Sequence, residues 1–160
     1  MSKLSEIARL IACILICQGA GFVGSLATAA AIPTWYTTLE KPSFTPPGWV
    51  FGPVWITLYL LMGLSLFFIW RKGLAEPGVK TALLFFGLQL VLNAVWSPVF
   101  FGMKAPLAGA IVIVLLWASV LLTMLHFSAL SRIATVLLIP YILWVSYAAV
   151  LNISIVILNS

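Results

Sequence analysis

Hydrophobic residues dominate five long stretches of the chain, and short polar segments separate them. The stretches cover about residues 7–31, 50–70, 81–101, 107–127 and 133–158. Each has about 20 residues or more, so a helix of that length crosses roughly 30 Å of hydrocarbon at 1.5 Å per residue. The pattern predicts an all-α integral membrane protein, a five-helix transmembrane bundle in which residues 1–160 form a single domain.

Prolines mark interruptions in this pattern. Pro53 is expected in the first turn of the second helix, which we place from about Val50. Pro98 is expected to kink or end the third helix, and Pro106 suits the start of the fourth. Pro140 lies inside the fifth stretch, which we treat as one span.

Composition supports a lipid environment. The chain is 64% hydrophobic and 7% charged, whereas a soluble domain has about 25% charged residues. Its net charge of +5 is spread over the ends of loops. Without a basic stripe, this charge indicates membrane topology and contact with lipid headgroups, and we expect no nucleic-acid partner.

The distribution of basic residues predicts an orientation. One side of the five-span arrangement carries six Lys and Arg residues and the other carries two, which favours the first side as the inside. We therefore expect the N-terminus inside, and the first loop and C-terminus outside, in the membrane of a bacterial cell. The six are Lys3, Arg9, Arg71, Lys72, Lys80 and Arg132, and the two are Lys41 and Lys104.

The first stretch allows two interpretations. Lys3 and Arg9 before an apolar run, with Ala27–Ala29 as a cleavage site, are also typical of a signal peptide. The run is long enough to span, however, and its small residues recur every fourth position, which lets a neighbouring helix approach closely. These small residues form two rows, Ala20/Gly24/Thr28 and Gly21/Ser25/Ala29.

Cysteine and histidine do not predict a metal site. Cys13 and Cys17 are four residues apart and share one helix face, where we interpret them as small packing residues. His126 is the only histidine and is expected near the opposite surface from the first loop. A haem ligated by histidine is therefore not expected.

The segment from Pro33 to Trp55 is unlike the rest of the chain. It holds five of the nine prolines and three of the seven tryptophans. Because proline fixes φ and disfavours helix in the preceding residue, this segment cannot be one continuous helix. We interpret its loop as a stiff, aromatic lid over a binding site.

Aromatic and amide side chains from separate helices are expected at one depth beneath this lid. Trp55 lies about 7 Å below the loop-side surface, and Asn93 and Trp96 lie about 8–12 Å below it. Ala148 and Asn152 lie about 9–15 Å below it. The candidate ligand-binding layer comprises Trp55, Tyr59, Asn93, Trp96, Ser97, Trp144, Ala148 and Asn152.

Each residue of this layer also has a purely structural interpretation, as an interfacial anchor or as a hydrogen bond between helices. Their convergence indicates a pocket for a large, flat, apolar ligand with a polar edge. A tetrapyrrole fits this description, and a sterol fits it less well. Asn93, Asn152 or Ser97 could bond the ligand edge, and Lys41 could meet a carboxylate at the mouth.

Hydrolytic or acid–base chemistry has little support. The three carboxylates, Glu6, Glu40 and Glu76, lie outside the spans. No carboxylate pair and no nucleophile–histidine pair can be built from the chain. We expect a protein that is not an enzyme.

Three ordered motifs carry a resemblance to a known family. They cover residues 35–59, 89–101 and 140–152, and with them the chain resembles the translocator protein family, also called tryptophan-rich sensory proteins or peripheral benzodiazepine receptors. The motifs are Trp35-Tyr36-x₃-Glu40-Lys41-Pro42-x₃-Pro46-Pro47-Gly48-x-Val50-Phe51 with Trp55 and Tyr59 following, Gln89-x₃-Asn93-x₂-Trp96-Ser97-x₂-Phe100-Phe101, and Pro140-Tyr141-x₂-Trp144-x₃-Ala148-x₂-Leu151-Asn152.

The resemblance implies a five-helix bundle, often a homodimer, whose first loop covers a pocket for porphyrins such as protoporphyrin IX. The porphyrin is a ligand, and no cofactor is required. The resemblance also implies light-dependent porphyrin breakdown in some bacterial members, with Trp55 and Trp144 at the matching positions. The pocket residues that it implies are Trp35, Tyr36, Pro46, Trp55, Asn93, Trp144 and Ala148.

Three functions remain in consideration. The leading interpretation is a membrane sensory protein that binds tetrapyrroles and regulates their handling or a stress response. The alternatives are a transporter of porphyrin or lipid and a light-dependent porphyrin-degrading activity. Residues 153–160 lack the tyrosine and basic residue of the animal members' cholesterol motif, which argues against high-affinity cholesterol binding and indicates a bacterial-type member.

Overall fold

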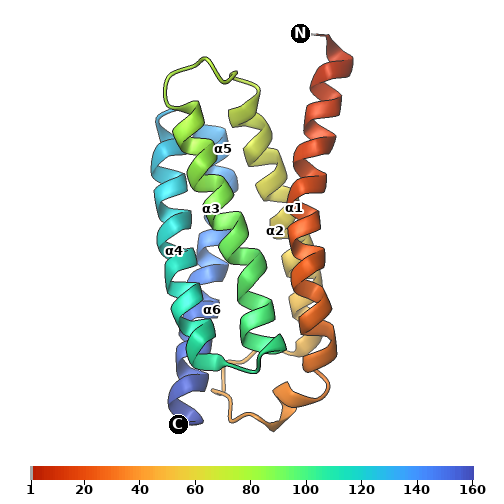
Figure 1. Ribbon diagram of the computed structural model, residues 1–160, viewed down its shortest axis with the longest axis vertical. Coiled ribbons are helices and arrows are strands. Elements are labelled where there is room, and N and C mark those ends of the chain that lie inside the picture. Colours follow the sequence, from red (N-terminus) through yellow and green to blue (C-terminus); the bar gives the residue numbers. More distant parts are fainter. Residues whose placement is uncertain (1) are drawn as a thin grey trace.

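The structure, a computed structural model, describes residues 2–160 as an elongated bundle of helices with its two termini at opposite ends (Figure 1). Five helical units are long and apolar enough to cross a membrane, with the last one in two pieces. The all-α, five-span architecture expected from the sequence is confirmed. The helices are α1 (Lys3–Ala31), α2 (Gly48–Trp70), α3 (Val79–Ser97), α4 (Pro106–Ser128), α5 (Arg132–Leu137) and α6 (Ile139–Leu158), with short turns η1 (Trp35–Thr38) and η2 (Pro98–Gly102).

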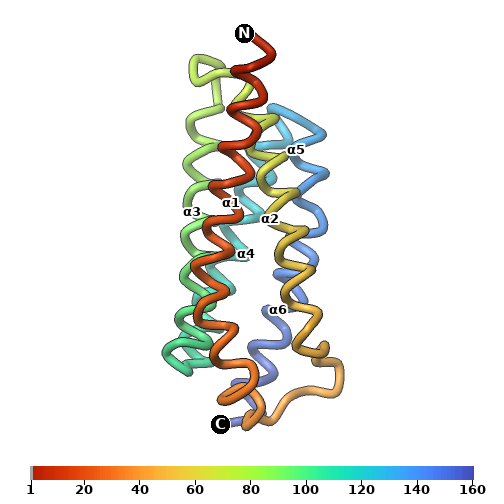
Figure 2. Tube along the Cα trace, turned by 90° about the vertical axis from the view of Figure 1, so that its right-hand side faces the viewer, coloured from red at the N-terminus to blue at the C-terminus, as the bar shows by residue number. Residues whose placement is uncertain are grey.

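Neighbouring helices form a closed ring. Helix α1 packs against both α2 and α3, α3 packs against α4, and α4 packs against α6, while α2 meets α5. Figure 2 shows α1 between α2 and α3, with the first loop at the C-terminal end of the bundle. This loop therefore covers the end at which α3 turns into α4 and at which α6 finishes.

The helix ends follow from local residue chemistry. Ser2 caps α1 by accepting a hydrogen bond from the Ser5 amide at 3.2 Å, and Ser131 caps α5 by accepting one from the Ala134 amide at 3.2 Å. Gly78 precedes α3 with φ +87°, a conformation that glycine adopts without strain. Because Pro106 has no amide hydrogen to lose, it is well placed at the start of α4.

Two prolines behave differently from the sequence-based expectation. Helix α2 begins at Gly48 rather than near Val50, so Pro53 is in its second turn and deprives the Trp49 carbonyl of its helical partner. The fifth stretch is one span, as expected, but it consists of two helices, because Pro140 has no amide hydrogen to donate and α5 stops before it. The Leu138 amide instead donates to Thr135 at 3.1 Å, and α6 starts from there.

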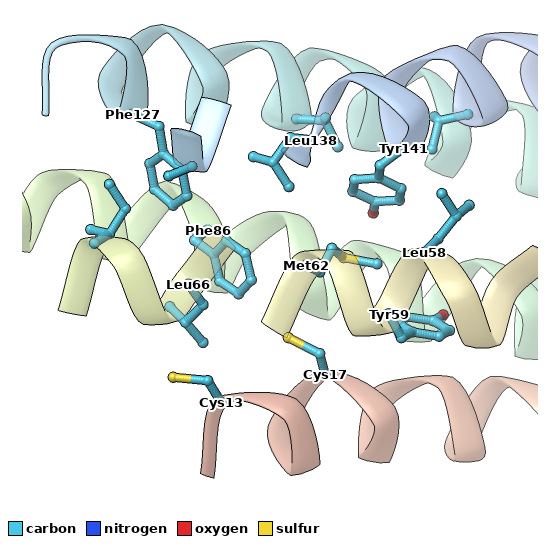
Figure 3. Close-up of a cluster of buried hydrophobic side chains, with 14 of the residues drawn as sticks. Cys13, Cys17, Leu58, Tyr59, Met62, Leu66, Phe86, Phe127, Leu138 and Tyr141 are labelled. Carbon is cyan, nitrogen blue, oxygen red and sulfur yellow. The ribbon is translucent and has the colours of Figure 1, made fainter. Parts of the chain in front are cut away.

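The buried apolar residues form two clusters, a smaller one beneath the first loop and a larger one that reaches toward the N-terminal end of the bundle. Cys13 and Cys17 are fully buried there, on the face of α1 that packs against α2, as expected of packing residues. In Figure 3 they lie beside Met62 and Leu66 of α2. At the surface of the same half, His126 stacks on Phe85 with ring centroids 4.6 Å apart.

Glycines allow the closest contacts between α1 and its neighbours α2 and α3. A Cβ on Gly63 would lie 2.8 Å from the Ile14 Cα, so the backbones of α1 and α2 touch at this point. On the α3 side, the Gly24 carbonyl accepts a hydrogen bond from Ser97 at 2.9 Å, and Thr28 bonds the same hydroxyl. The row Ala20/Gly24/Thr28 thus meets a neighbouring helix as the sequence indicated.

We predict that Gly63→Ala destabilises the protein. Its new methyl group meets backbone, which cannot rotate away, and overpacking of this kind costs about 1–3 kcal/mol. Thermal unfolding in detergent should show a midpoint several degrees below the wild type. The matched control is Gly87→Ala in α3, where nothing lies within 4 Å. An unfolding midpoint no lower for Gly63→Ala than for Gly87→Ala would contradict this contact.

Candidate functional site

A cavity of about 590 Å³ lies between α1, α2 and α3 in the half of the bundle near the first loop. Aromatic side chains from α2, α3 and η2 form much of its wall, and α1 contributes small and polar residues. Its volume is within the range of small-molecule sites, and its few polar groups among apolar ones match their usual make-up. The aromatic residues are Phe51, Trp55, Tyr59, Trp96 and Phe101, and the polar ones include Gln18, Thr28, Asn93 and Ser97.

The mouth of this cavity lies between α1 and α2. Phe22 of α1 and Ile56 of α2 both line the cavity, and these residues are 65% and 62% exposed. The Gln18 amide donates to the Ile56 carbonyl at 3.1 Å and so joins the two helices at this edge. Since the exposed sides of spanning helices face lipid, the cavity opens toward the bilayer.

A second, much smaller cavity of about 20 Å³ lies directly under the first loop. Residues of the loop and of α6 line it, together with aromatic side chains that also line the large cavity. The two cavities therefore adjoin at one shared aromatic wall. The wall consists of Phe51, Trp55, Trp96 and Phe101, and the small cavity also touches Tyr36, Trp144, Ala148 and Asn152.

A chain of hydrogen bonds runs from the large cavity into the core. The Tyr59 hydroxyl donates to the Asn93 carbonyl oxygen, and the Asn93 amide donates to the Tyr141 hydroxyl at 2.7 Å. Tyr141 in turn donates to Gln89 at 2.7 Å. Figure 3 shows Tyr59 and Tyr141 with their hydroxyl groups inside the bundle, on either side of Met62. All four groups are satisfied without water or ligand, as hydrocarbon surroundings require.

Other polar groups of the predicted layer also have protein partners. The Ser97 hydroxyl bonds α1, as described above. Asn152 accepts from the Trp96 indole at 3.0 Å and donates to the Pro106 carbonyl at 2.8 Å. These bonds join α3, α4 and α6, so these side chains already have a structural role beside the cavities.

Two buried donors, unlike the groups above, have no hydrogen-bond partner in the described part of the chain. Among residues 2–160, the Tyr36 hydroxyl and the Trp144 Nε1 are the only buried side-chain nitrogen or oxygen atoms without a hydrogen-bond partner. Both residues line the small cavity. Burial raises the pKa of Tyr36 to about 12, so this hydroxyl keeps its proton and remains a donor at physiological pH.

The first loop is fastened to α6. The backbone of Glu40 exchanges two hydrogen bonds with the Asn159 side chain, at 3.0 Å and 2.8 Å. The Tyr147 hydroxyl bonds the Phe44 carbonyl, and the two rings are 6.2 Å apart. Lys41 donates to the carbonyls of Tyr36 at 2.8 Å and Leu39 at 3.0 Å, which holds the loop against η1. The loop is thus a fixed cover over the small cavity.

The structure divides the predicted site residues into groups. Tyr59, Asn93 and Ser97 line the large cavity only, and Tyr36, Trp144, Ala148 and Asn152 line the small one only. Trp55 and Trp96 line both. Trp35 and Pro46 line neither, and Trp35 packs instead on Phe100 with ring centroids 5.7 Å apart.

Sequence reasoning missed the contribution of α1 and part of the aromatic wall. Phe51 lies one turn before Trp55 on the same helix face, which is a signal that could have identified it. Gln18 and Thr28 of α1 had no such signal, because the small residues around them indicated only close helix packing.

Comparison with known proteins agrees with this architecture. A model of the TspO/MBR family matches residues 13–158. The chain is 46% identical to the tryptophan-rich protein TspO of Chlorobaculum tepidum, over 96% of this chain and 98% of that protein. It is 43% identical to the protein of the same name from Archaeoglobus fulgidus, over 97% and 99% of the two chains. It is 37% identical to the human translocator protein, over 82% and 78%.

These matches cover almost the whole bundle, and they include the first loop and the aromatic wall between the two cavities. With five helical units able to span a bilayer, the protein is an integral, multi-pass membrane protein, and it belongs to the TspO/MBR family.

Proposed function

We propose that this protein is a membrane sensory or translocator protein that binds a porphyrin in the cavity between α1, α2 and α3. The observation that carries the proposal is the aromatic wall of a cavity of about 590 Å³. Relatives of the chain are named tryptophan-rich sensory protein and translocator protein, names that describe receptors or carriers rather than enzymes. A receptor for an apolar ligand needs a preformed apolar site, which this cavity supplies.

The wall favours a flat ligand. Trp55 and Tyr59 are stacked with ring centroids 5.5 Å apart, and Trp96 stacks on Phe100 at 5.3 Å, so the rings present broad faces held in place by their neighbours. Flat aromatic ligands gain from offset stacking on such faces. A sterol has no π-system and would gain only from burial, so the wall supports a tetrapyrrole over a sterol.

The mouth between α1 and α2 supports entry from the bilayer. Porphyrins with few charged groups partition into membranes, and a ligand in the bilayer would meet Phe22 and Ile56 at the mouth. For the orientation, we propose that the N-terminal end of the bundle faces the cytoplasm of a bacterial cell. The first loop and Ser160 then face outward, as the six-to-two distribution of basic residues indicates.

We predict that Gly52→Phe weakens binding of protoporphyrin IX by about tenfold or more, equivalent to about 1.4 kcal/mol. Gly52 lines the large cavity, and a Cβ added there would have no atom within 4 Å, so a side chain can start from this position and its ring would occupy ligand space. The dissociation constant is measured from the change in the porphyrin absorbance band. Gly87→Phe on exposed α3 surface is the control, and equal affinities for the two variants would contradict the location of the site.

A second function, light-dependent porphyrin breakdown, is favoured by one observation. Trp55 of α2, which belongs to the wall that we assign to the porphyrin, lines the small cavity together with Trp144 of α6. If these indoles take part, replacing both by Phe keeps flat faces for stacking but removes the oxidisable rings. We predict that the double variant loses the light-dependent decay of the porphyrin band at protein concentrations that keep the porphyrin bound. Equal decay rates with the wild type, with the double variant and without protein would show that the protein does not have this activity.

The proposed orientation predicts that alkaline phosphatase fused after Ser160 is active in a bacterial host, because the enzyme folds only outside the cytoplasm. A fluorescent protein that requires the cytoplasm should be dim at the same position. The matched controls carry the same reporters at the N-terminus and should behave oppositely. A fluorescent fusion that is bright and a phosphatase that is inactive at Ser160 would show that the orientation is the opposite of the one proposed.

A further inference from the structure

Tyr36 and Trp144 both line the small cavity under the first loop. Their hydroxyl and Nε1 are the two buried side-chain donors that residues 2–160 leave unpaired. A buried polar group without a hydrogen-bond partner destabilises a fold, because its contacts with water are lost and not replaced. Tyr36 is 6% exposed, and its ring lies against Phe101 with centroids 5.6 Å apart. Two such groups from separate elements, η1 and α6, line one cavity.

The remaining polar groups around the cavities do not share this property. Asn93 and Asn152 are bonded to other side chains and to backbone, and Ser97 is bonded to α1. A ligand that bonded these groups would first have to break bonds between helices. Tyr36 and Trp144 can accept a new partner without losing an old one.

The chemistry of the missing partner follows from the two donors. An indole N–H only donates, and the Tyr36 hydroxyl remains protonated at physiological pH. The complementary group is therefore a hydrogen-bond acceptor. The cavity volume of about 20 Å³ corresponds to about one water-sized group, so an oxygen fits and a ring does not.

Lys41 lines neither cavity, but its positive charge next to Tyr36 favours an acidic group. The Lys41 ammonium lies 4.9 Å from the centroid of the Tyr36 ring. Two of its three hydrogens are given to backbone carbonyls, and the single ion pair within residues 2–160, between Arg71 and Glu6, does not involve it. Within these residues no carboxylate pairs with Lys41, and its charge lies next to the Tyr36 ring.

We propose that the small cavity is an acceptor subsite, in which the Tyr36 hydroxyl and the Trp144 Nε1 bind a carboxylate or carbonyl oxygen on the edge of a ligand held in the large cavity. The ring system stays on the large-cavity side of the wall, and a side group reaches between Phe51, Trp55, Trp96 and Phe101. This subsite rests on the proposed porphyrin site, and it adds selection of the ligand by its oxygen-bearing edge.

The test uses three porphyrins with the same ring and different side groups. Mesoporphyrin IX carries two propionates, its dimethyl ester carries two ester carbonyls, and etioporphyrin carries alkyl groups alone. Wild-type protein should bind mesoporphyrin IX about tenfold or more tighter than etioporphyrin, as expected for hydrogen bonds to a charged acceptor. Tight binding of the ester as well assigns the subsite to a carbonyl oxygen, and weak binding of the ester assigns it to a carboxylate.

The variants Tyr36→Phe and Trp144→Phe each remove one donor and keep a ring. In each, the ratio of the etioporphyrin dissociation constant to that of mesoporphyrin IX should fall several-fold toward one. Ala148→Phe fills the small cavity from α6 and should abolish the ratio even if one donor variant does not fold. Trp117→Phe is the control, since it also removes an indole donor and keeps a ring, but its Nε1 donates to Ser146 and Trp117 lines neither cavity; its ratio should equal that of the wild type.

Failure of the subsite and failure of the porphyrin site give different results. If none of the three porphyrins binds, the proposed function is wrong, and so is the subsite, because it rests on that function. If all three bind wild type equally, the porphyrin site stands and the subsite is wrong. If the donor variants lower the thermal stability but leave the ligand ratio at the wild-type value, the two donors bond a buried water only, and the subsite is also wrong.

Discussion

Hydrocarbon offers no hydrogen-bond partner, and this constraint governs the interior of the bundle. Tyr59, Asn93, Tyr141 and Gln89 bond one another in a chain that links α2, α3 and α6. Asn152 in the same way joins α6 to α3 and α4. Most polar side chains inside the protein therefore hold helices together, and the few that remain unpaired are the ones available to a ligand.

The same bundle combines tight and open regions. In the N-terminal half, Gly63 lets α1 and α2 touch at their backbones, and the core there is filled. In the other half, small residues of α1 face aromatic residues of α2 and α3 across a cavity of about 590 Å³. Gly21 leaves space that the Tyr59 ring occupies, because a Cβ on Gly21 would lie 2.4 Å from that ring. Small residues thus serve close packing at one depth and ligand space at another.

The first loop joins α1 to α2 and is also bonded to the C-terminal part of the chain. Its hydrogen bonds to Tyr147 of α6 and to Asn159, the residue after α6, fix it over the small cavity, and Lys41 holds η1 to the loop backbone. Tyr36 is therefore a rigid part of the site although it belongs to a loop. A ligand edge would meet donors that are already oriented, which lowers the entropy lost on binding.

Hydropathy alone determined the number of spanning units, because each needs about 20 apolar residues to satisfy its backbone in lipid. Helix periodicity and length also predicted that aromatic and amide residues gather beneath the loop, where Trp55, Trp96 and Trp144 line cavities. Only the tertiary structure decided which amides are already bonded, that an aromatic wall divides the layer into two cavities, and that α1 lines the larger one. The reason is physical: the order of helices around the ring and their rotation determine every partner, and these depend on contacts between residues far apart in the sequence.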